Sequence, residues 1–150
     1  MTVVDLIFAS LVGRRAGDAP IIACLYTGHA PPPNCAPMLR SPEPQTGQPL
    51  DTSFADHLAS ALALNPAVHD GAVMLGREDV SGLYRISGWS YRLFPADAAG
   101  GKVTNRGSAF NSCLDMSIVS RVDRLYLITR DGICRFEKGS VTQLVYEMLS

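Results

Sequence analysis

The chain has 150 residues, 47% of them hydrophobic and 18% charged, with a formal net charge of −1. A chain of this length can bury a sizeable core without disulfide or metal staples, so we expect a single compact, soluble domain spanning 1–150. The near-neutral charge argues against a sequence-independent grip on polymeric nucleic acid, because that requires a basic face.

The first residues, MTVVDLIFASLVGRRAG, place two arginines after a short apolar run, which is the reverse of a secretory signal. No segment approaches the roughly 18 apolar residues that a membrane span needs. We therefore expect a cytoplasmic protein with no membrane partner. In that compartment the cysteines are expected to be free thiols: Cys24, Cys35, Cys113 and Cys134.

The first third of the chain predicts a helix, a strand and a long loop. Apolar residues at helical spacing predict a helix over 3–15, and the β-branched run APIIACLY (19–26) predicts a buried strand. Residues 27–49 are rich in proline, which lacks the amide that helices and central strands require. We expect a surface loop there, and favour a disordered or spacer role over a functional one.

The segment LDTSFADHLASALAL (50–64) predicts a helix capped by Asp51, Thr52 or Ser53 and ended by Asn65 and Pro66. A strand is expected over 71–77.

One or two strands are expected over 83–95, bent at Gly88. Trp89 and Tyr91 lie two residues apart there, so strand geometry predicts that they face the same side, where they pack in the core in preference to stacking on a base.

The last part of the chain predicts a helix over 108–120 and a hairpin of 123–129 and 133–139, turned at Asp131 and Gly132. An amphipathic helix capped by Ser140 is expected over 140–149. Because strands and helices are intermixed, the predicted class is α/β (α+β), with a mixed central sheet flanked by helices.

The stretch NPAVHDGA (65–72) puts a histidine, an aspartate and a glycine where a strand should begin. In one interpretation Asp70 caps a turn and Gly71 supplies a special backbone angle. In the other, the glycine lets a phosphate or ribose approach the backbone, while the carboxylate holds a divalent metal or accepts a proton. The residues by themselves leave both interpretations open.

Residues 50–75 resemble the first sequence block of diadenylate cyclase (DAC) domains, where a helix leads into Pro-Leu-His-Asp-Gly-Ala-Val and a strand. The matching residues are Val68, His69, Asp70, Gly71, Ala72 and Val73. The strand near 19–25 and the hairpin over 122–139 are similar to other family elements, so the resemblance covers about 19–139. It implies a DAC-like mixed sheet with an ATP pocket. It also implies that two such domains face each other and join two ATP molecules into cyclic di-AMP.

The family's second block, Thr-Arg-His-Arg-Ala-Ala, opens a short helix that holds triphosphate. The corresponding VTNRGSAF (103–110) keeps one arginine, Arg106, in either of two registers. Arg130 also stands where the family hairpin has a carboxylate. Losing two positioned donors costs on the order of 10³-fold or more in rate. The resemblance thus implies a catalytically degenerate nucleotide-binding sensor.

Three other interpretations stay open: an active diadenylate cyclase making cyclic di-AMP from two ATP, a scaffold that binds a protein partner through 27–49, and a glycine-serine helix start with no ligand.

By the motif match, Asp70 takes the catalytic and metal-binding role if the protein is an enzyme, with Mg²⁺ or Mn²⁺ accompanying a bound nucleotide. The candidate nucleotide-binding residues come from the matched blocks: His69, Asp70, Gly71, Ala72, Thr104, Asn105, Arg106, Gly107, Ser108 and Thr129. The expected partners are an ATP-like nucleotide or a cyclic dinucleotide, and a second copy of the chain or an effector protein. This hypothesis requires Asp70 and the helix start near Gly107 to border one solvent-reachable hollow.

Overall fold

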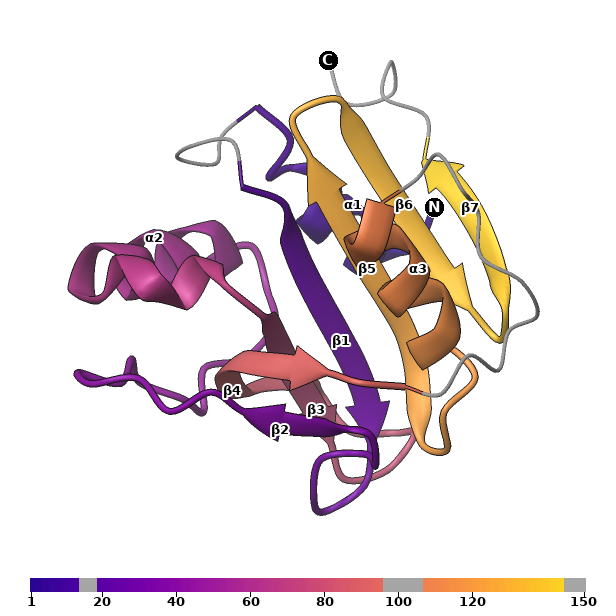
Figure 1. Cartoon of the computed structure of the whole chain (residues 1–150), viewed down its shortest axis with the longest axis horizontal. Helices are drawn as coiled ribbons and strands as arrows, with labels where there is room; N and C mark the ends of the chain where they lie inside the picture. Colours follow the sequence, from indigo (N-terminus) through magenta and orange to yellow (C-terminus); the bar gives the residue numbers. More distant parts are fainter. Residues whose placement is uncertain (14–18, 96–106, 145–150) are drawn as a thin grey trace.

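The computed structural model describes residues 1–13, 19–95 and 107–144, which form a seven-stranded sheet with helices on both faces (Figure 1). The elements in chain order are α1 (Val3–Ala9), β1 (Ile21–Thr27), β2 (Cys35–Pro37), α2 (Phe54–Leu64), the 3₁₀ helix η1 (Pro66–His69), β3 (Ala72–Arg77), β4 (Arg85–Leu93), α3 (Gly107–Met116), β5 (Val122–Thr129), β6 (Gly132–Glu137) and β7 (Ser140–Leu144). None of the helices in these ranges has the length and apolar character needed to cross a bilayer.

The strand order is β2-β4-β3-β1-β5-β6-β7, and only β1 and β3 run parallel. The parallel pair needs a crossover, which the long loop and α2 supply between β1 and β3. The remaining neighbours are antiparallel, so the sheet is mixed, and the predicted α+β class with helices flanking a central sheet is confirmed.

The sheet has a core on each face because its central strands are apolar on both sides. In β1, Ala23 and Leu25 point to the face that α1 and α2 cover, and Cys24 and Tyr26 point to the face that α3 covers. Figure 1 shows α3 in front of β5 and β6, with α1 behind the sheet. This continuous burial explains why APIIACLY reads as an unbroken apolar run and not an alternating one.

Several predicted elements are confirmed with shifted ends. The helix expected over 50–64 begins at Phe54. Just before it, the Asp51 carboxylate accepts a hydrogen bond of 2.8 Å from the amide of Ser53. The helix over 3–15 is shorter, because α1 ends at Ala9. The hairpin turned at Asp131 and Gly132 is formed by β5 and β6.

The helix predicted over 140–149 is wrong where the structure describes it, since β7 is a strand paired with β6. Lys138 (φ 48°) and Gly139 (φ 81°) both adopt left-handed backbone between Glu137 and Ser140, which are paired across the turn. Two such residues are the mark of a tight hairpin turn. Residues 145–149 lie outside the described part of the chain.

The proline-rich loop over 27–49 is ordered against the sheet, so the expectation of disorder was wrong. Its residues 35–37 form β2 on the edge of β4. Further along, the Met38 amide donates to the Ser90 carbonyl at 2.8 Å, and the Trp89 indole donates to the Gln45 carbonyl at 2.8 Å. The loop therefore runs along the edge of β4 and extends the sheet irregularly there.

Trp89 and Tyr91 face opposite sides of the sheet, contrary to the prediction from strand spacing. Trp89 is buried on the α2 face, while Tyr91 packs on the α3 face. Ser90 between them has φ 56°, and the register of β3 against β4 shifts near Gly88. The expected bend at Gly88 is thus present, and this irregularity reverses the alternation that a regular strand would have.

Candidate functional site

A cavity of about 550 Å³ opens between the start of β3, the end of β4 and the first turns of α3. Its walls are Ala19, Pro20, Ile22, Met38, His69, Asp70, Gly71, Ala72, Tyr91, Arg92, Leu93, Ser108, Ala109 and Ser112. The Asp70 segment and the helix start at Ser108 therefore border one hollow, as the sequence hypothesis requires.

The cavity brings together half of the candidate residues. His69, Asp70, Gly71, Ala72 and Ser108 line it, and Gly107 is the residue before Ser108 at the start of α3. Thr129 does not line it but borders a separate hollow of about 230 Å³ beside β6. The other three candidates, Thr104, Asn105 and Arg106, lie outside the described residues.

The turn interpretation of His-Asp-Gly explains Gly71. Asp70 ends η1, its amide donating to the Ala67 carbonyl at 3.1 Å. Gly71 then has φ 86°, and a Cβ there would lie 2.9 Å from backbone atoms of Ser90 and Tyr91. The backbone that approaches Gly71 closely is that of β4, so the glycine is required by packing within the protein, whether or not a ligand binds nearby.

A cation that sequence reasoning missed lies beside the Asp70 carboxylate. The Arg40 guanidinium lies 3.5 Å from Asp70 Oδ2, and Arg40 Nε donates to Ser90 Oγ at 3.2 Å. The Arg40 side chain is 22% exposed, whereas that of Asp70 is 66% exposed. Arg40 comes from the proline-rich loop, 30 residues before Asp70, and nothing local in the sequence signals this pairing.

A second cation, Arg92, lines the cavity and makes no ion pair with the described residues. Opposite the Asp70 turn, Ser108 and Ala109 belong to the first turn of α3, whose amides have no partners within the helix. Arg92 and the start of α3 therefore add positive charge to a cavity wall that also carries the Asp70 carboxylate.

The rest of the cavity is apolar or weakly polar. Ile22, Met38 and Leu93 contribute hydrocarbon surface, and Tyr91 contributes a ring. Burial raises the pKa of the Tyr91 phenol, so it stays neutral and keeps a hydroxyl donor at physiological pH. A few polar groups on an otherwise apolar wall are typical of small-molecule sites.

The hollow continues along α3. A second depression of about 410 Å³ shares Leu93, Ser108 and Ser112 with the cavity and runs on to Phe94 and Asp115. The accessible site is therefore longer than the main cavity, which suits a ligand with more than one ring system.

The described residues do not fit a resident divalent metal. Nowhere in 1–13, 19–95 and 107–144 do three His, Cys, Asp or Glu side chains gather to hold one. Asp70 is the one carboxylate among the residues that line the cavity, and a guanidinium already lies beside it. A hard dication prefers several oxygen ligands, and a neighbouring cation opposes it.

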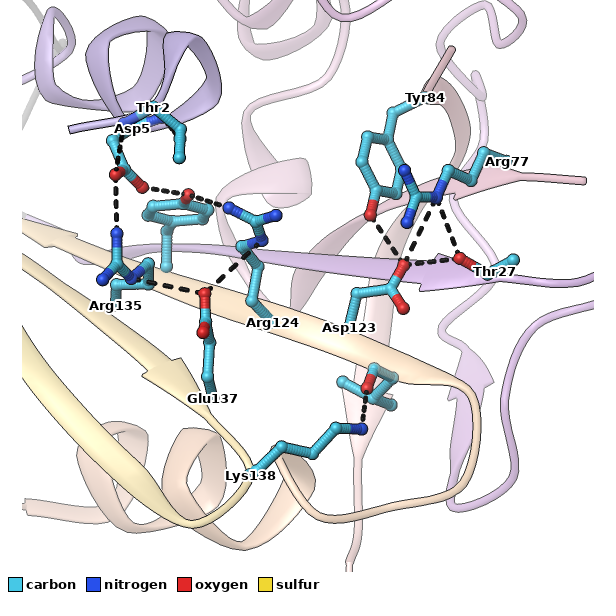
Figure 2. Close-up of polar contacts among 12 residues, drawn as sticks. Thr2, Asp5, Thr27, Arg77, Tyr84, Asp123, Arg124, Arg135, Glu137 and Lys138 are labelled. Carbon is cyan, nitrogen blue, oxygen red and sulfur yellow. Dashed lines mark hydrogen bonds and ion pairs between the residues drawn. The ribbon is translucent and has the colours of Figure 1, made fainter. Parts of the chain in front are cut away.

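Two polar networks lie elsewhere, and none of their residues lines the cavity. In the first, Asp123 accepts hydrogen bonds of 2.6 Å from both Thr27 and Tyr84, with Arg77 at 3.7 Å (Figure 2). These side chains tie the ends of β1 and β3 to β5. Burial, followed by the Asp123 hydrogen bond, raises the pKa of Tyr84, so its phenol serves as a structural donor.

In the second network Asp5 of α1 is fully buried, with Arg135 at 2.6 Å and a short hydrogen bond from Tyr126 (Figure 2). Arg124 and Arg135 both pair with Glu137, at 3.7 and 3.4 Å. Burial raises the pKa of Asp5, but the bonds from Tyr126, the Thr2 amide and Arg135 outweigh it and lower that pKa overall. The network fastens α1 to the sheet.

No protein-family model matches the chain, and no curated protein matches it. Solved structures do. A double mutant of DacA, a diadenylate cyclase from Staphylococcus aureus, gives a TM-score of 0.57 at 13% identity, with 97% of this chain and 89% of the solved chain covered. A hypothetical membrane spanning protein from Bacillus cereus gives 0.56 at 13% identity, with 95% and 62% covered. The chain therefore has a DAC-like fold.

Proposed function

We propose that this protein is a DAC-like nucleotide-binding sensor that holds an ATP-like nucleotide or a cyclic dinucleotide in the cavity beside Asp70 and does not cyclise it. The observation that carries the proposal is the meeting of the His-Asp-Gly-Ala turn with the start of α3 around one hollow. Its volume of about 550 Å³ lies within the range of roughly 300–1,000 Å³ that ligand pockets occupy.

The two ends of the cavity suit the two ends of a nucleotide. Phosphate oxygens would accept hydrogen bonds from the amides of the first turn of α3 and from Arg92, which provides planar, bidentate donors. A base would lie against Tyr91 and Leu93. The extension along α3 leaves room for the second half of a dinucleotide.

Catalytic degeneracy is supported by charge. Phosphoryl transfer depends on positive groups placed around the transferring phosphate, usually with a metal ion. Here one arginine stands in the block where the family has three basic or imidazole groups, and the candidate catalytic carboxylate is paired with Arg40. A sensor needs the groups that bind the nucleotide but not those that transfer its phosphate. It also needs a second copy of the chain or an effector protein that receives the signal.

Isothermal titration of the purified chain with ATP, NAD and cyclic di-AMP tests the proposal. Ser112 lies on the cavity wall one helical turn after Ser108, so Ser112→Trp should fill the hollow and weaken binding about tenfold or more. Ser60→Trp is the matched control, because Ser60 is on α2 and borders a different hollow of about 370 Å³. It should leave the affinity within about twofold.

Two outcomes would contradict the proposal. If none of the three nucleotides binds, the protein is not a nucleotide sensor. If labelled ATP with Mg²⁺ or Mn²⁺ yields cyclic product that Asp70→Asn abolishes, the protein is an active cyclase instead.

A further inference from the structure

The proline-rich loop brings Arg40 along the backbone of β4 to Asp70, which lines the cavity, although Arg40 is not itself a lining residue. The Met38 amide bonds the Ser90 carbonyl, and the Trp89 indole bonds the Gln45 carbonyl, on either side of Arg40 in the loop. Arg40 itself reaches over β4 to Ser90 Oγ and on to Asp70. Its position is thus set by contacts before it, after it and along its own side chain.

Ser90 accepts a hydrogen bond from the Nε atom of Arg40 and so fixes the inner side of its guanidinium. Ser90 is 1% exposed and its hydroxyl lies 3.4 Å from the Val68 carbonyl, in the segment that leads to Asp70. The Nε atom of Arg40 is therefore occupied inside the protein, while its terminal nitrogen points at a carboxylate that is 66% exposed. The inner bond fixes the guanidinium, and the outer contact is the one that solvent or a ligand can reach.

The outer contact is also the weaker of the two. At 3.5 Å and with an exposed carboxylate, the Arg40–Asp70 pair is screened by water and contributes little to stability. A phosphate brought to the cavity carries more negative charge than Asp70 and offers a guanidinium bidentate acceptors. Exchange of Asp70 for a phosphate as the partner of Arg40 is thus electrostatically favourable.

We propose that Arg40, beside the cavity wall, supplies the positive charge that a divalent metal would otherwise bring: it pairs with Asp70 in the free protein and turns to a phosphate of the bound nucleotide, which therefore binds without metal. The proposal rests on nucleotide binding in the cavity. It makes Arg40 a ligand-binding residue and Asp70 its resting partner.

This assignment reverses the expected sign of an Asp70 substitution. If Asp70 held a metal for the nucleotide, Asp70→Asn would abolish binding. If Asp70 competes with the nucleotide for Arg40, Asp70→Asn frees the guanidinium and removes a negative charge from the wall. Affinity should then stay the same or rise.

The test is isothermal titration of ATP and cyclic di-AMP into the full chain, in EDTA and again in excess MgCl₂ or MnCl₂. For the wild-type chain we expect dissociation constants that agree within about twofold with and without metal. Arg40→Ala should weaken binding about tenfold or more, because a charge-assisted bond to phosphate is lost. Asp70→Asn should bind at least as tightly as the wild-type chain.

Arg85→Ala is the matched control, since Arg85 on β4 also bonds the loop, at the Gly47 carbonyl 3.1 Å away, whereas the described ion pair of Asp70 is with Arg40. It should bind as the wild-type chain does. Arg40→Lys keeps the charge and loses the planar head group, so it should fall between wild type and Arg40→Ala. This variant and the wild-type comparison in EDTA decide the question even if Arg40→Ala does not fold.

Each contrary result has a distinct meaning. Binding that needs metal and disappears in Asp70→Asn would overturn the role of Arg40 while leaving a nucleotide sensor in place. Equal affinities for Arg40→Ala and Arg85→Ala would do the same. Binding of neither nucleotide to the wild-type chain, with or without metal, would remove the sensor function and this inference together.

Discussion

Gly71→Ala should destabilise the protein more than its backbone angle alone accounts for. At φ 86° an L residue costs roughly 1–2 kcal/mol. The added Cβ would also lie 2.7 Å from Met38 Cε and 2.9 Å from backbone atoms of Ser90 and Tyr91. The methionine end can move, but the β4 backbone is held by strand pairing, and overpacking of this kind adds about 1–3 kcal/mol. We expect a total loss of about 2–5 kcal/mol.

Gly107→Ala provides the matched comparison. Its φ of 82° is nearly the same, yet a Cβ there would meet no described atom within 4 Å. The expected loss is therefore the backbone cost of roughly 1–2 kcal/mol.

Thermal and urea unfolding followed by circular dichroism measure both variants. In a chain of this size 1 kcal/mol shifts Tm by about 2–4 °C, so Gly71→Ala should melt several degrees below Gly107→Ala. Equal melting temperatures would refute the close approach of β4 to Gly71. They would favour the other interpretation of this glycine, in which it lets a ligand approach the backbone.

Three further predictions concern the polar contacts. Arg135→Met leaves the Asp5 carboxylate buried without its cation, so the free energy of unfolding should fall by about 3 kcal/mol, whereas Arg92→Met, at an exposed arginine, should change it by less than about 0.5 kcal/mol. Because the folded pKa of Asp5 is lowered, its contribution is complete above the ordinary carboxyl value of about 3.9 and is lost as pH falls through the folded value. Acid titrations of stability should therefore fall more steeply for the wild-type chain than for Asp5→Asn, and parallel curves would contradict the shift. Arg121 donates to two loop carbonyls at 2.7 and 2.9 Å, so Arg121→Ala should speed exchange of the amide hydrogens of residues 28–30, with no change there in Arg85→Ala.

The candidate site was partly readable from the sequence. The His-Asp-Gly-Ala stretch and the glycine-serine helix start were both identified, and the structure places Asp70 and Ser108 on one cavity. The cation that lines the cavity and the one that pairs with Asp70 were not identified. Arg92 sits in a strand where an exposed arginine is ordinary, and Arg40 sits in a loop whose prolines suggested disorder.

Local pattern was sufficient where an element's character is set by its own residues. The unbroken apolar runs of β1 and β3, the apolar face of α2 and the Asp-Gly hairpin all follow from burial and turn preferences over a few neighbouring residues. These elements and the mixed α+β class were predicted because the hydrophobic period and the turn chemistry are local.

Only the tertiary structure decided the rest, because the deciding partner in each case lies outside the element whose residues were read. β7 is a strand because it pairs with the edge of β6. Trp89 and Tyr91 face opposite sides of the sheet because Ser90 adopts a left-handed backbone where the register of β4 against β3 shifts. Arg40 meets Asp70 because loop, strand and turn are stacked there. Contacts across 30 residues or more leave no periodic trace in a sequence, since they depend on where the chain returns and not on what stands beside each residue.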